Sequence, residues 1–201
     1  MSDHRLEIWG DSKSGNCYKL QLVCAQLGVD YDWHDVDVMS GETRSRQFLE
    51  MNPNGKVPVA RLPDGRFLSE SNAILYHLAE GSRLDGQDAF ERANILRWMF
   101  FEQYSHEPGV AVARFIVKYL GSPPDKRDRL AARQTQGYKA LDVMERVLSE
   151  HPFIAEERYT IADICLYAYT HVAPDGGILL DTYPAVRAWL SARRGQLNQR
   201  S

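Results

Sequence analysis

Apolar and polar positions in the first part of the chain follow the periods of strands and helices in turn. Leu6 and Ile8 occupy alternate positions, which predicts a short strand. The next apolar residues recur every three or four positions, which predicts a helix that begins near Cys17 and ends at Gly28. Further along, we expect a strand over 31–38, a helix over 43–51, two short strands joined by Pro63-Asp64-Gly65, and a helix over 71–80. This order of elements predicts an α/β unit.

The second part of the chain shows only helical patterns. The polar, turn-rich segment Gly81–Gly86 predicts a linker between the two parts. A helix is expected to begin near Asp88 and to end at Pro108-Gly109, because proline interrupts a helix interior. Thr160 and Asp163 have the spacing of a capping box and predict the start of another helix. The expected architecture is a small α/β domain followed by an all-α domain.

The composition is that of an ordinary globular protein and narrows the class of partner. The 201 residues are 44% hydrophobic and 25% charged, and the net charge of −3 comes without a dense basic run. We therefore expect neither a nucleic acid nor an acidic membrane as partner. No apolar run is long enough to cross a bilayer, and residues 1–5 lack the apolar core of a signal peptide.

Cysteine and histidine usage indicates a reduced compartment and no metal. The three cysteines, Cys17, Cys24 and Cys165, are odd in number and form no C-x-x-C pair, which argues against a disulfide framework. The six histidines are scattered and match no zinc-binding spacing. We expect a cytoplasmic protein without a metal site.

The segment Asn52–Val59, followed by Glu70-Ser71, is the most informative stretch of the chain. Val57-Pro58 opens an apolar run, and an X-Pro bond in a tight turn is the usual place for a cis peptide bond. A cis bond there would turn the backbone N–H and C=O of Val57 toward a ligand. Ser71 opens a helix and offers a hydroxyl, free N–H groups and the positive end of the helix dipole, all suited to a carboxylate. Together these features predict a site for a small peptide.

The loop Gly10–Gly15 lies between a strand and a helix, where a phosphate-binding loop would lie. Asn16 and Cys17 occupy the positions at which such a loop needs Lys and then Ser or Thr, which excludes nucleotide hydrolysis. From the local sequence alone, the simplest role of Ser14 is an N-cap, and the alternative is a hydrogen bond to a ligand thiolate. Cys17 falls on an apolar helical stripe, so packing is favoured over redox chemistry.

Three motifs together resemble those of the cytosolic glutathione transferases. They are Val57-Pro58 followed by Glu70-Ser71, the segment Ser14-Gly15-Asn16-Cys17, and Thr160-Ile161-Ala162-Asp163. The resemblance extends over about residues 5–195, and the combination is specific although no single motif is. Among these proteins, the chain is similar to bacterial members with serine or threonine in the active site, and the Nu-like group is a candidate.

The resemblance implies two domains. The first, over residues 1–81, is a thioredoxin-like domain that binds glutathione as co-substrate, and the second, over residues 87–201, is an all-helical domain that contributes the second-substrate pocket. It also implies that Ser14 is the catalytic hydroxyl and that Asn16 lies beside the glutathione sulfur.

The resemblance also implies how the ends of glutathione are held. Ser71 would bind the γ-glutamyl carboxylate and Glu70 the ammonium group, although a simple capping pair is the alternative for these two residues. The peptide backbone of glutathione would lie along Val57 and Pro58. Independently of the resemblance, Lys56 is a cation beside this clamp, and it either reaches a carboxylate or is only solvated, with the carboxylate contact favoured.

The implied activity is that of a homodimeric, cytoplasmic glutathione S-transferase in detoxification, which joins the glutathione thiolate to a small electrophile. The alternatives are a glutathione-dependent disulfide reductase of the Nu-like type and a non-catalytic glutathione-binding or regulatory module. Tyr104 and Arg114, polar-tipped among apolar neighbours, are candidates for the wall of the second-substrate pocket. The sequence does not name the electrophile.

Overall fold

The computed structural model describes residues 5–155 and 157–198, and the chain divides into two units at the boundary between Ser82 and Arg83. The expectation for the signal-peptide region falls mainly on residues 1–4, and these lie outside the described residues, as do the outermost ends of the two expected domains. The expected fold class, an α/β unit followed by a helical unit, is confirmed.

A four-stranded mixed sheet is the centre of the first unit. Its strands are β1 (Leu6–Gly10), β2 (Tyr31–Asp35), β3 (Val59–Arg61) and β4 (Phe67–Ser69). The order across the sheet is β2-β1-β3-β4, with β1 parallel to β2 and the other neighbours antiparallel. Ile8 is opposite Trp33 on one side and Ala60 on the other, which places the middle of β1 in the interior of the sheet.

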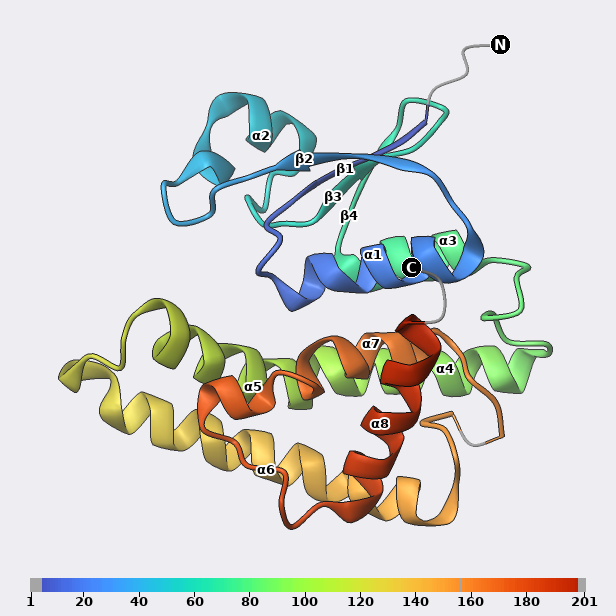
Figure 1. Ribbon diagram of the computed structural model, residues 1–201. Coiled ribbons are helices and arrows are strands. Elements are labelled where there is room, and N and C mark those ends of the chain that lie inside the picture. The colour runs from blue at the N-terminus through green and yellow to red at the C-terminus, as the bar shows by residue number, and fades with distance from the viewer. Residues whose placement is uncertain (1–4, 156, 199–201) are drawn as a thin grey trace. The chain divides into compact units, whose positions relative to one another are not determined.

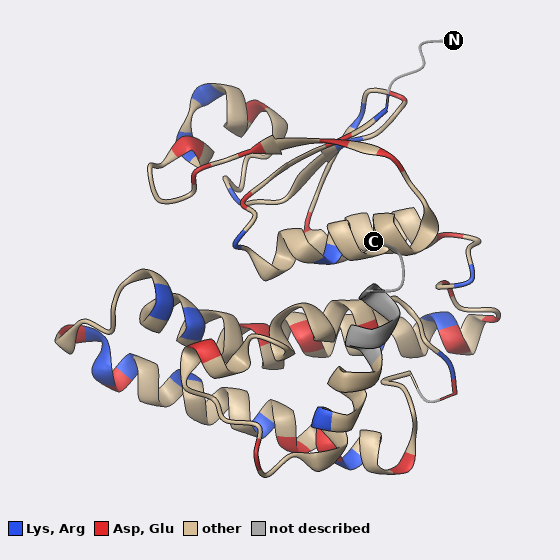
Figure 2. Ribbon diagram, in the orientation of Figure 1, with Lys and Arg blue, Asp and Glu red and all other residues tan. Residues whose placement is uncertain are grey.

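Helices cover both faces of this sheet. α1 (Gly15–Leu27) and α3 (Ser71–Ala79) lie side by side along one face (Figure 1). The 3-10 turn Glu42–Arg44 and α2 (Arg46–Met51) follow β2 and lie toward the other face, where Phe48 packs with Val36 and with Val59 of β3. Apart from one residue, α1 and α3 are uncharged (Figure 2), as is typical of helices packed against a sheet and against each other.

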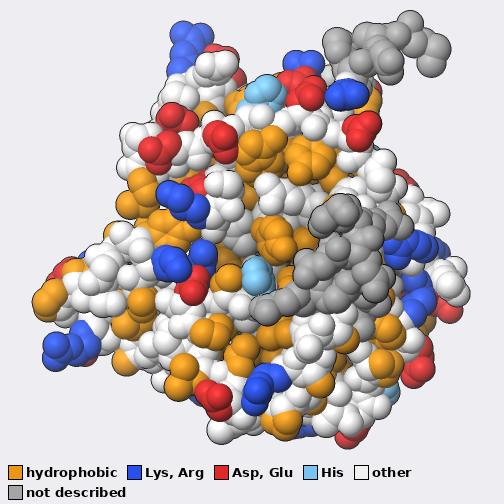
Figure 3. Space-filling view, in the orientation of Figure 1, with side chains coloured by type: hydrophobic (Ala, Val, Ile, Leu, Met, Phe, Trp, Pro, Cys, Tyr) orange, Lys and Arg blue, Asp and Glu red, His pale blue; other side chains and the backbone are white. Residues whose placement is uncertain are grey.

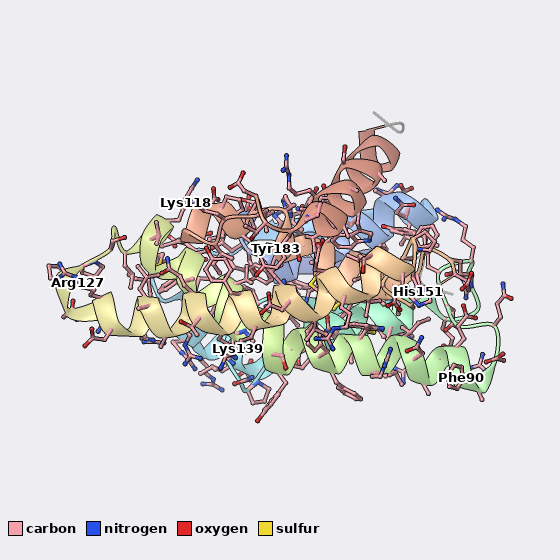
Figure 4. All side chains as sticks on the ribbon, turned by 90° about the horizontal axis from the view of Figure 1, so that it is seen from below. Phe90, Lys118, Arg127, Lys139, His151 and Tyr183 are labelled. Carbon is pink, nitrogen blue, oxygen red and sulfur yellow. The ribbon has the colours of Figure 1, made fainter. Side chains whose placement is uncertain are left out.

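The second unit consists of helices around a fully buried central one. They are α4 (Ala89–Phe101), α5 (Glu107–Arg114), α6 (Arg127–Glu150), α7 (Ile161–Thr170) and α8 (Pro184–Asn198), with 3-10 turns at Pro124–Lys126 and Ala173–Gly176. Every residue of α7 is buried. Tyr183 lies beside α6 and donates its hydroxyl to Asp142 at 2.9 Å (Figure 4). None of the described helices is long and apolar enough to cross a membrane.

The predicted helix end at Pro108-Gly109 is wrong. The chain passes from α4 through a π-helical segment, Glu102–His106, directly into α5, and Pro108 lies in the first turn of α5. Proline is tolerated there because the wider π turn that precedes it accommodates the ring within the continuing helix. Gly109 has a separate role: a Cβ at this position would lie 2.5 Å from the backbone nitrogen of Gly137, so the two glycines allow α5 and α6 to approach closely.

Side chains of both signs are interspersed with apolar ones over the face shown in Figure 3. The exposed apolar residues of the described chain include Phe67 in β4 and Phe90 and Phe100 in α4. Phe100 is 69% exposed, which is unusual for so large an apolar side chain.

The predicted capping box at the start of α7 is confirmed, and its carboxylate joins several elements of the second unit. The Asp163 carboxylate accepts hydrogen bonds from the backbone N–H of Thr160 and of Ile154, each at 3.1 Å, and from Nε1 of Trp189 at 2.9 Å. It is fully buried, so it ties the start of α7 to the preceding loop and to α8.

We predict that Asp163→Ala lowers the free energy of unfolding by about 3 kcal/mol or more, because it leaves several buried donors without an acceptor. The control is Asp128→Ala, since Asp128 is also an acidic residue in the first turn of a helix but is exposed. Its removal is expected to cost less than about 0.5 kcal/mol. Urea denaturation of both variants measures the difference, and equal effects would contradict this role of Asp163.

Candidate functional site

The N-terminus of α1 carries the predicted hydroxyl. Ser14 is the N-cap of α1, and its Oγ accepts a hydrogen bond from the backbone N–H of Cys17 at 3.4 Å. Its own backbone N–H donates to the carbonyl of Asp11 at 2.9 Å, which closes the loop after β1. Gly10 is required at the end of β1, because a Cβ there would lie 2.6 Å from the Trp33 ring. The N-cap role of Ser14 is therefore confirmed, and a second role toward a ligand thiolate stays a prediction.

The N-termini of α1 and α3 are joined by a side-chain hydrogen-bond network. Ser71 is the first residue of α3 and only 4% exposed, and its hydroxyl donates to Oδ1 of Asn16 at 3.1 Å. The Lys19 ammonium group donates to Oγ of Ser71 at 3.3 Å and to Oδ1 of Asn72 at 2.9 Å. Two predicted site residues, Asn16 and Ser71, are thus brought together from different helices.

Lys19 is the member of this network that the sequence analysis missed. Its side chain is fully buried, although a lysine in a helix usually faces solvent. The expected apolar stripe of α1 ran through Cys17 and Leu20, and Lys19 lies off that stripe. Leu22 and Val23, three and four residues later, are buried as well and extend the covered surface to this side of the helix. That wider apolar surface was the sequence signal from which the burial of Lys19 could have been predicted.

Glu70 precedes Ser71 and has an unusual backbone conformation. Its φ is 68° and its ψ is 111°, a region that residues other than glycine rarely adopt. Among the described residues, no side-chain cap hydrogen bond joins Glu70 to α3, so the capping-pair interpretation does not describe it. Its carboxylate instead accepts from Nδ2 of Asn54 at 3.5 Å and is exposed. The strained residue therefore presents an acidic group beside the start of α3.

The segment over residues 56–58, which precedes β3, is held in place by side chains of neighbouring residues. The Val57-Pro58 peptide bond is cis, as predicted, and Pro58 is buried. Asn52 donates Nδ2 to the carbonyl of Lys56 at 2.8 Å, and Val57 packs against the cluster of buried residues under α2. Lys56 itself is exposed. The side chains fix the segment from one side and leave the Lys56 ammonium group in solvent.

The two cysteine thiols of the first unit are buried, and burial raises their pKa and disfavours the reactive thiolate form. Burial raises the pKa of the Cys17 thiol to about 11, and the hydrogen bond with Ser14 opposes this effect only in part. Burial alone raises the pKa of the Cys24 thiol to about 12. Both residues are buried in the core, so the packing role expected for Cys17 fits its surroundings.

Tyr104 and Arg114 lie in different surroundings in the second unit. Tyr104 belongs to the π-helical segment and is 86% exposed. Arg114 ends α5, and its guanidinium donates to Asp175 at 3.2 Å and to the hydroxyl of Tyr119 at 3.3 Å. The ion pair lowers the pKa of Asp175 against the opposing effect of burial. The structure brings Arg114 together with acidic and phenolic groups, and a pocket wall built from these two residues stays a prediction.

The first unit contains several groups that can stabilise an anion, and they lie at the starts of α1 and α3. A hydroxyl and an amide lie at the start of α1, the N–H groups of α3 begin at Ser71, and the buried ammonium group of Lys19 lies behind them. In the described residues, no group of three or more His, Cys, Asp or Glu side chains is arranged to hold a metal ion. The arrangement suits a ligand with a carboxylate at one end and a second anionic group near Ser14.

Two family models match the chain. The glutathione S-transferase N-terminal domain matches residues 14–80, and the glutathione S-transferase C-terminal domain matches residues 110–195. The chain is 33% identical over 182 residues to glutathione S-transferase 2 of Anopheles gambiae, which covers 88% of this chain and 84% of that relative.

Solved structures agree with this comparison. The crystal structure of a glutathione S-transferase from Pseudomonas fluorescens Pf-5 is 50% identical, with a TM-score of 0.92 and coverage of 94% of both chains. A second glutathione transferase family member from Pseudomonas fluorescens Pf-5, solved with two glutathione bound, is 26% identical, with a TM-score of 0.82 and coverage of 94% of this chain and 87% of that one.

We predict that neither Cys17 nor Cys24 of the native protein reacts with an aromatic disulfide reagent at about pH 8. At that pH, a thiol with a pKa of about 11 is roughly one part in a thousand thiolate. Labelling in denaturant serves as the control, because all three cysteines should then react. A fast native reaction that disappears in Cys17→Ser would show that Cys17 is a reactive thiol after all.

Proposed function

Because the chain belongs to the glutathione S-transferase family, we propose that it is an enzyme that binds glutathione in its first unit and transfers the glutathione sulfur to a small electrophile. The thiolate attacks an electrophilic carbon and a new carbon–sulfur bond forms. At a saturated or aromatic carbon the leaving group departs with its bonding electron pair, and at an activated double bond the π electron pair moves to the neighbouring atom, which takes a proton from solvent. The thiol proton leaves to solvent before the attack. The chain's own groups have to bind the tripeptide and favour its thiolate form.

The glutamyl end of glutathione is assigned to the start of α3. Ser71 supplies a buried hydroxyl and the first N–H of the helix, both of which suit the α-carboxylate. The Glu70 carboxylate suits the neighbouring ammonium group, and its left-handed backbone turns the chain into α3 at this point. These are the roles that the family resemblance implies for the two residues.

The middle of the tripeptide is assigned to the segment before β3. Val57 and Pro58 would pair with its backbone, and the side chain of Asn52 holds the carbonyl of Lys56 so that the segment keeps its shape. Lys56, exposed at the same place, is the candidate partner of a ligand carboxylate.

Thiolate formation is assigned to Ser14 and Asn16. A cysteinyl thiol has a pKa near 8.5, and lowering it by about two units requires roughly 2.7 kcal/mol. A hydrogen bond to a charged partner contributes roughly 1.5–3 kcal/mol, and the N-terminus of a helix roughly 0.3–1 kcal/mol. One hydroxyl and one helix end are therefore sufficient, and Ser14 provides the hydroxyl at the N-cap of α1.

The observation that carries the proposal is the hydrogen bond from Ser71 to Asn16 at 3.1 Å. It joins the group assigned to the carboxylate to a group assigned to the sulfur, which supports their belonging to one connected site. Two side chains that served only their own helices would not need a hydrogen bond that joins positions 55 residues apart in the sequence.

The helical unit is assigned the second substrate, with Tyr104 and Arg114 as candidate wall residues. We also propose a cytoplasmic homodimer with a role in detoxification. Large exposed apolar side chains support association with a second copy, and Tyr104, Phe90 and Phe100, 86%, 76% and 69% exposed, are examples. The same exposure makes Tyr104 a candidate for the contact between copies as well as for the pocket.

We predict that Ser14→Ala lowers turnover while glutathione affinity stays within about threefold, because one hydrogen bond to the thiolate is lost and those to the rest of the tripeptide remain. The pKa of the bound thiol should rise by about one unit or more, since each unit corresponds to roughly 1.36 kcal/mol. Thiolate absorbance against pH, measured on the glutathione complex of both forms, reports this directly.

Ser12→Ala is the matched control, because Ser12 is an exposed hydroxyl in the same loop. It should leave both turnover and the thiol pKa unchanged. If Ser14→Ala also leaves both unchanged, Ser14 is only an N-cap and Asn16 becomes the candidate. If the wild-type complex shows no lowered thiol pKa at all, the binding-module alternative replaces the enzyme. Parallel assays with a disulfide and a carbon electrophile separate the reductase from the transferase.

A further inference from the structure

Lys19 is the only charged residue in α1 or α3, and it is completely buried. Removing an ammonium group from water is costly unless hydrogen bonds and opposite charge compensate for it. A fully buried lysine is therefore retained for a reason that simple packing does not give. Its position directly behind the start of α3 suggests what the reason is.

The donor and acceptor chemistry fixes the direction of the network. An ammonium group can only donate, so the Ser71 oxygen must act as acceptor toward Lys19. The single hydroxyl hydrogen of Ser71 is then turned away from Lys19, toward Asn16. Lys19 thus leaves the Ser71 hydroxyl as a donor toward the side where a ligand anion would arrive. A hydroxyl without this neighbour could rotate and offer a lone pair to the carboxylate instead.

Resting on the function proposed above, we infer that Lys19 is a positioning residue for the glutamyl carboxylate of glutathione. It orients the Ser71 hydroxyl toward that carboxylate and places a positive charge behind it. Through Ser71 it also links the carboxylate to Asn16, the residue assigned to the sulfur.

Distances support an effect of the charge itself. Lys19 Nζ lies 3.3 Å from Oγ of Ser71, and a carboxylate hydrogen-bonded to that hydroxyl lies roughly 2.7 Å further on. The two charges would then be separated by at most about 6 Å, a range over which opposite charges in a partly buried site attract appreciably. The attraction acts on a carboxylate and is absent for a neutral ligand group.

The link to Asn16 adds a consequence for the sulfur end. When the carboxylate takes the Ser71 hydrogen bond, Oδ1 of Asn16 loses that donor. The Asn16 amide is then free to reorient with its N–H groups toward the thiolate. Binding of the glutamyl end would in this way prepare the sulfur end, and Lys19 sets the starting geometry for the exchange.

A purely structural lysine would behave differently. If Lys19 only joined α1 to α3, its replacement would lower stability and would weaken every ligand of the site alike. A positioning residue affects ligands with the carboxylate and leaves others unchanged. The two roles therefore differ in selectivity between ligands, which calorimetry can measure.

The experiment compares two ligands on two proteins. Glutathione is compared with 4-aminobutyryl-cysteinyl-glycine, which keeps the ammonium group and lacks only the glutamyl carboxylate. Lys19→Met keeps the length of the side chain and removes its charge. We expect the variant to bind glutathione about ten- to a hundredfold more weakly than wild type, the value of a charge-assisted hydrogen bond. The analogue should bind both proteins within about twofold of each other.

Lys139→Met is the matched control, because Lys139 is an exposed lysine on α6 in the other unit (Figure 4). It should change neither affinity. Lys19→Gln is the second variant, to be used if Lys19→Met does not fold. It keeps an N–H donor for Ser71 without the charge, and it should weaken glutathione selectively as well.

Two results would overturn the inference while wild-type protein still binds glutathione. One is a Lys19 variant that binds glutathione as tightly as wild type, and the other is equal weakening of both ligands. If wild-type protein does not bind glutathione at all, the proposed function fails first and the inference fails with it.

Discussion

One hydrogen-bonded cluster, buried between two packed helices, determines the geometry of the candidate site. The Ser71 hydroxyl accepts from Lys19 at 3.3 Å and donates to Asn16 at 3.1 Å, so three side chains from α1 and α3 meet at one oxygen. Buried polar groups are costly when unsatisfied, which means that α1 and α3 can pack in only one register. The N-termini of both helices are therefore fixed with respect to each other, and everything assigned to glutathione lies around them.

Because this cluster positions the groups that would bind anions, the rest of the first unit has only to supply stability. The sheet and the apolar packing of α1 against α3 supply stability, and the segment before β3 is held independently by Asn52. The buried thiols of Cys17 and Cys24 are held protonated by their surroundings and do not compete with the ligand thiol. Anion stabilisation is left to a hydroxyl, an amide, two helix ends and one buried ammonium group.

Local sequence signals predicted the features that depend on neighbouring residues. The N-cap at Ser14, the end of α1 at Gly28, the capping box of α7 and the cis bond at Val57-Pro58 all follow from short-range chemistry. Pro108 shows the limit of such signals. A proline predicts the end of a helix, but the π-helical segment before Pro108 allows the helix to continue into α5.

Features that depend on distant partners were not predictable in the same way. Lys19 is buried only because α3, about fifty residues later, covers that side of α1. The hydrogen bond between Asn16 and Ser71 and the ion pair between Arg114 and Asp175 likewise join residues that are far apart in sequence. The positive φ of Glu70 results from its position between β4 and α3, and it cannot be predicted from the residue type. Periodicity identifies the faces of a helix, whereas tertiary packing decides which of them are covered.

The most direct test of the central claim is a crystal structure of the protein with glutathione. The account predicts one glutathione molecule in the first unit, with its glutamyl carboxylate hydrogen-bonded to Ser71, its backbone along Val57 and its sulfur within hydrogen-bond distance of Ser14. Glutathione bound with its carboxylate away from Ser71, or with its sulfur remote from both Ser14 and Asn16, would contradict the account.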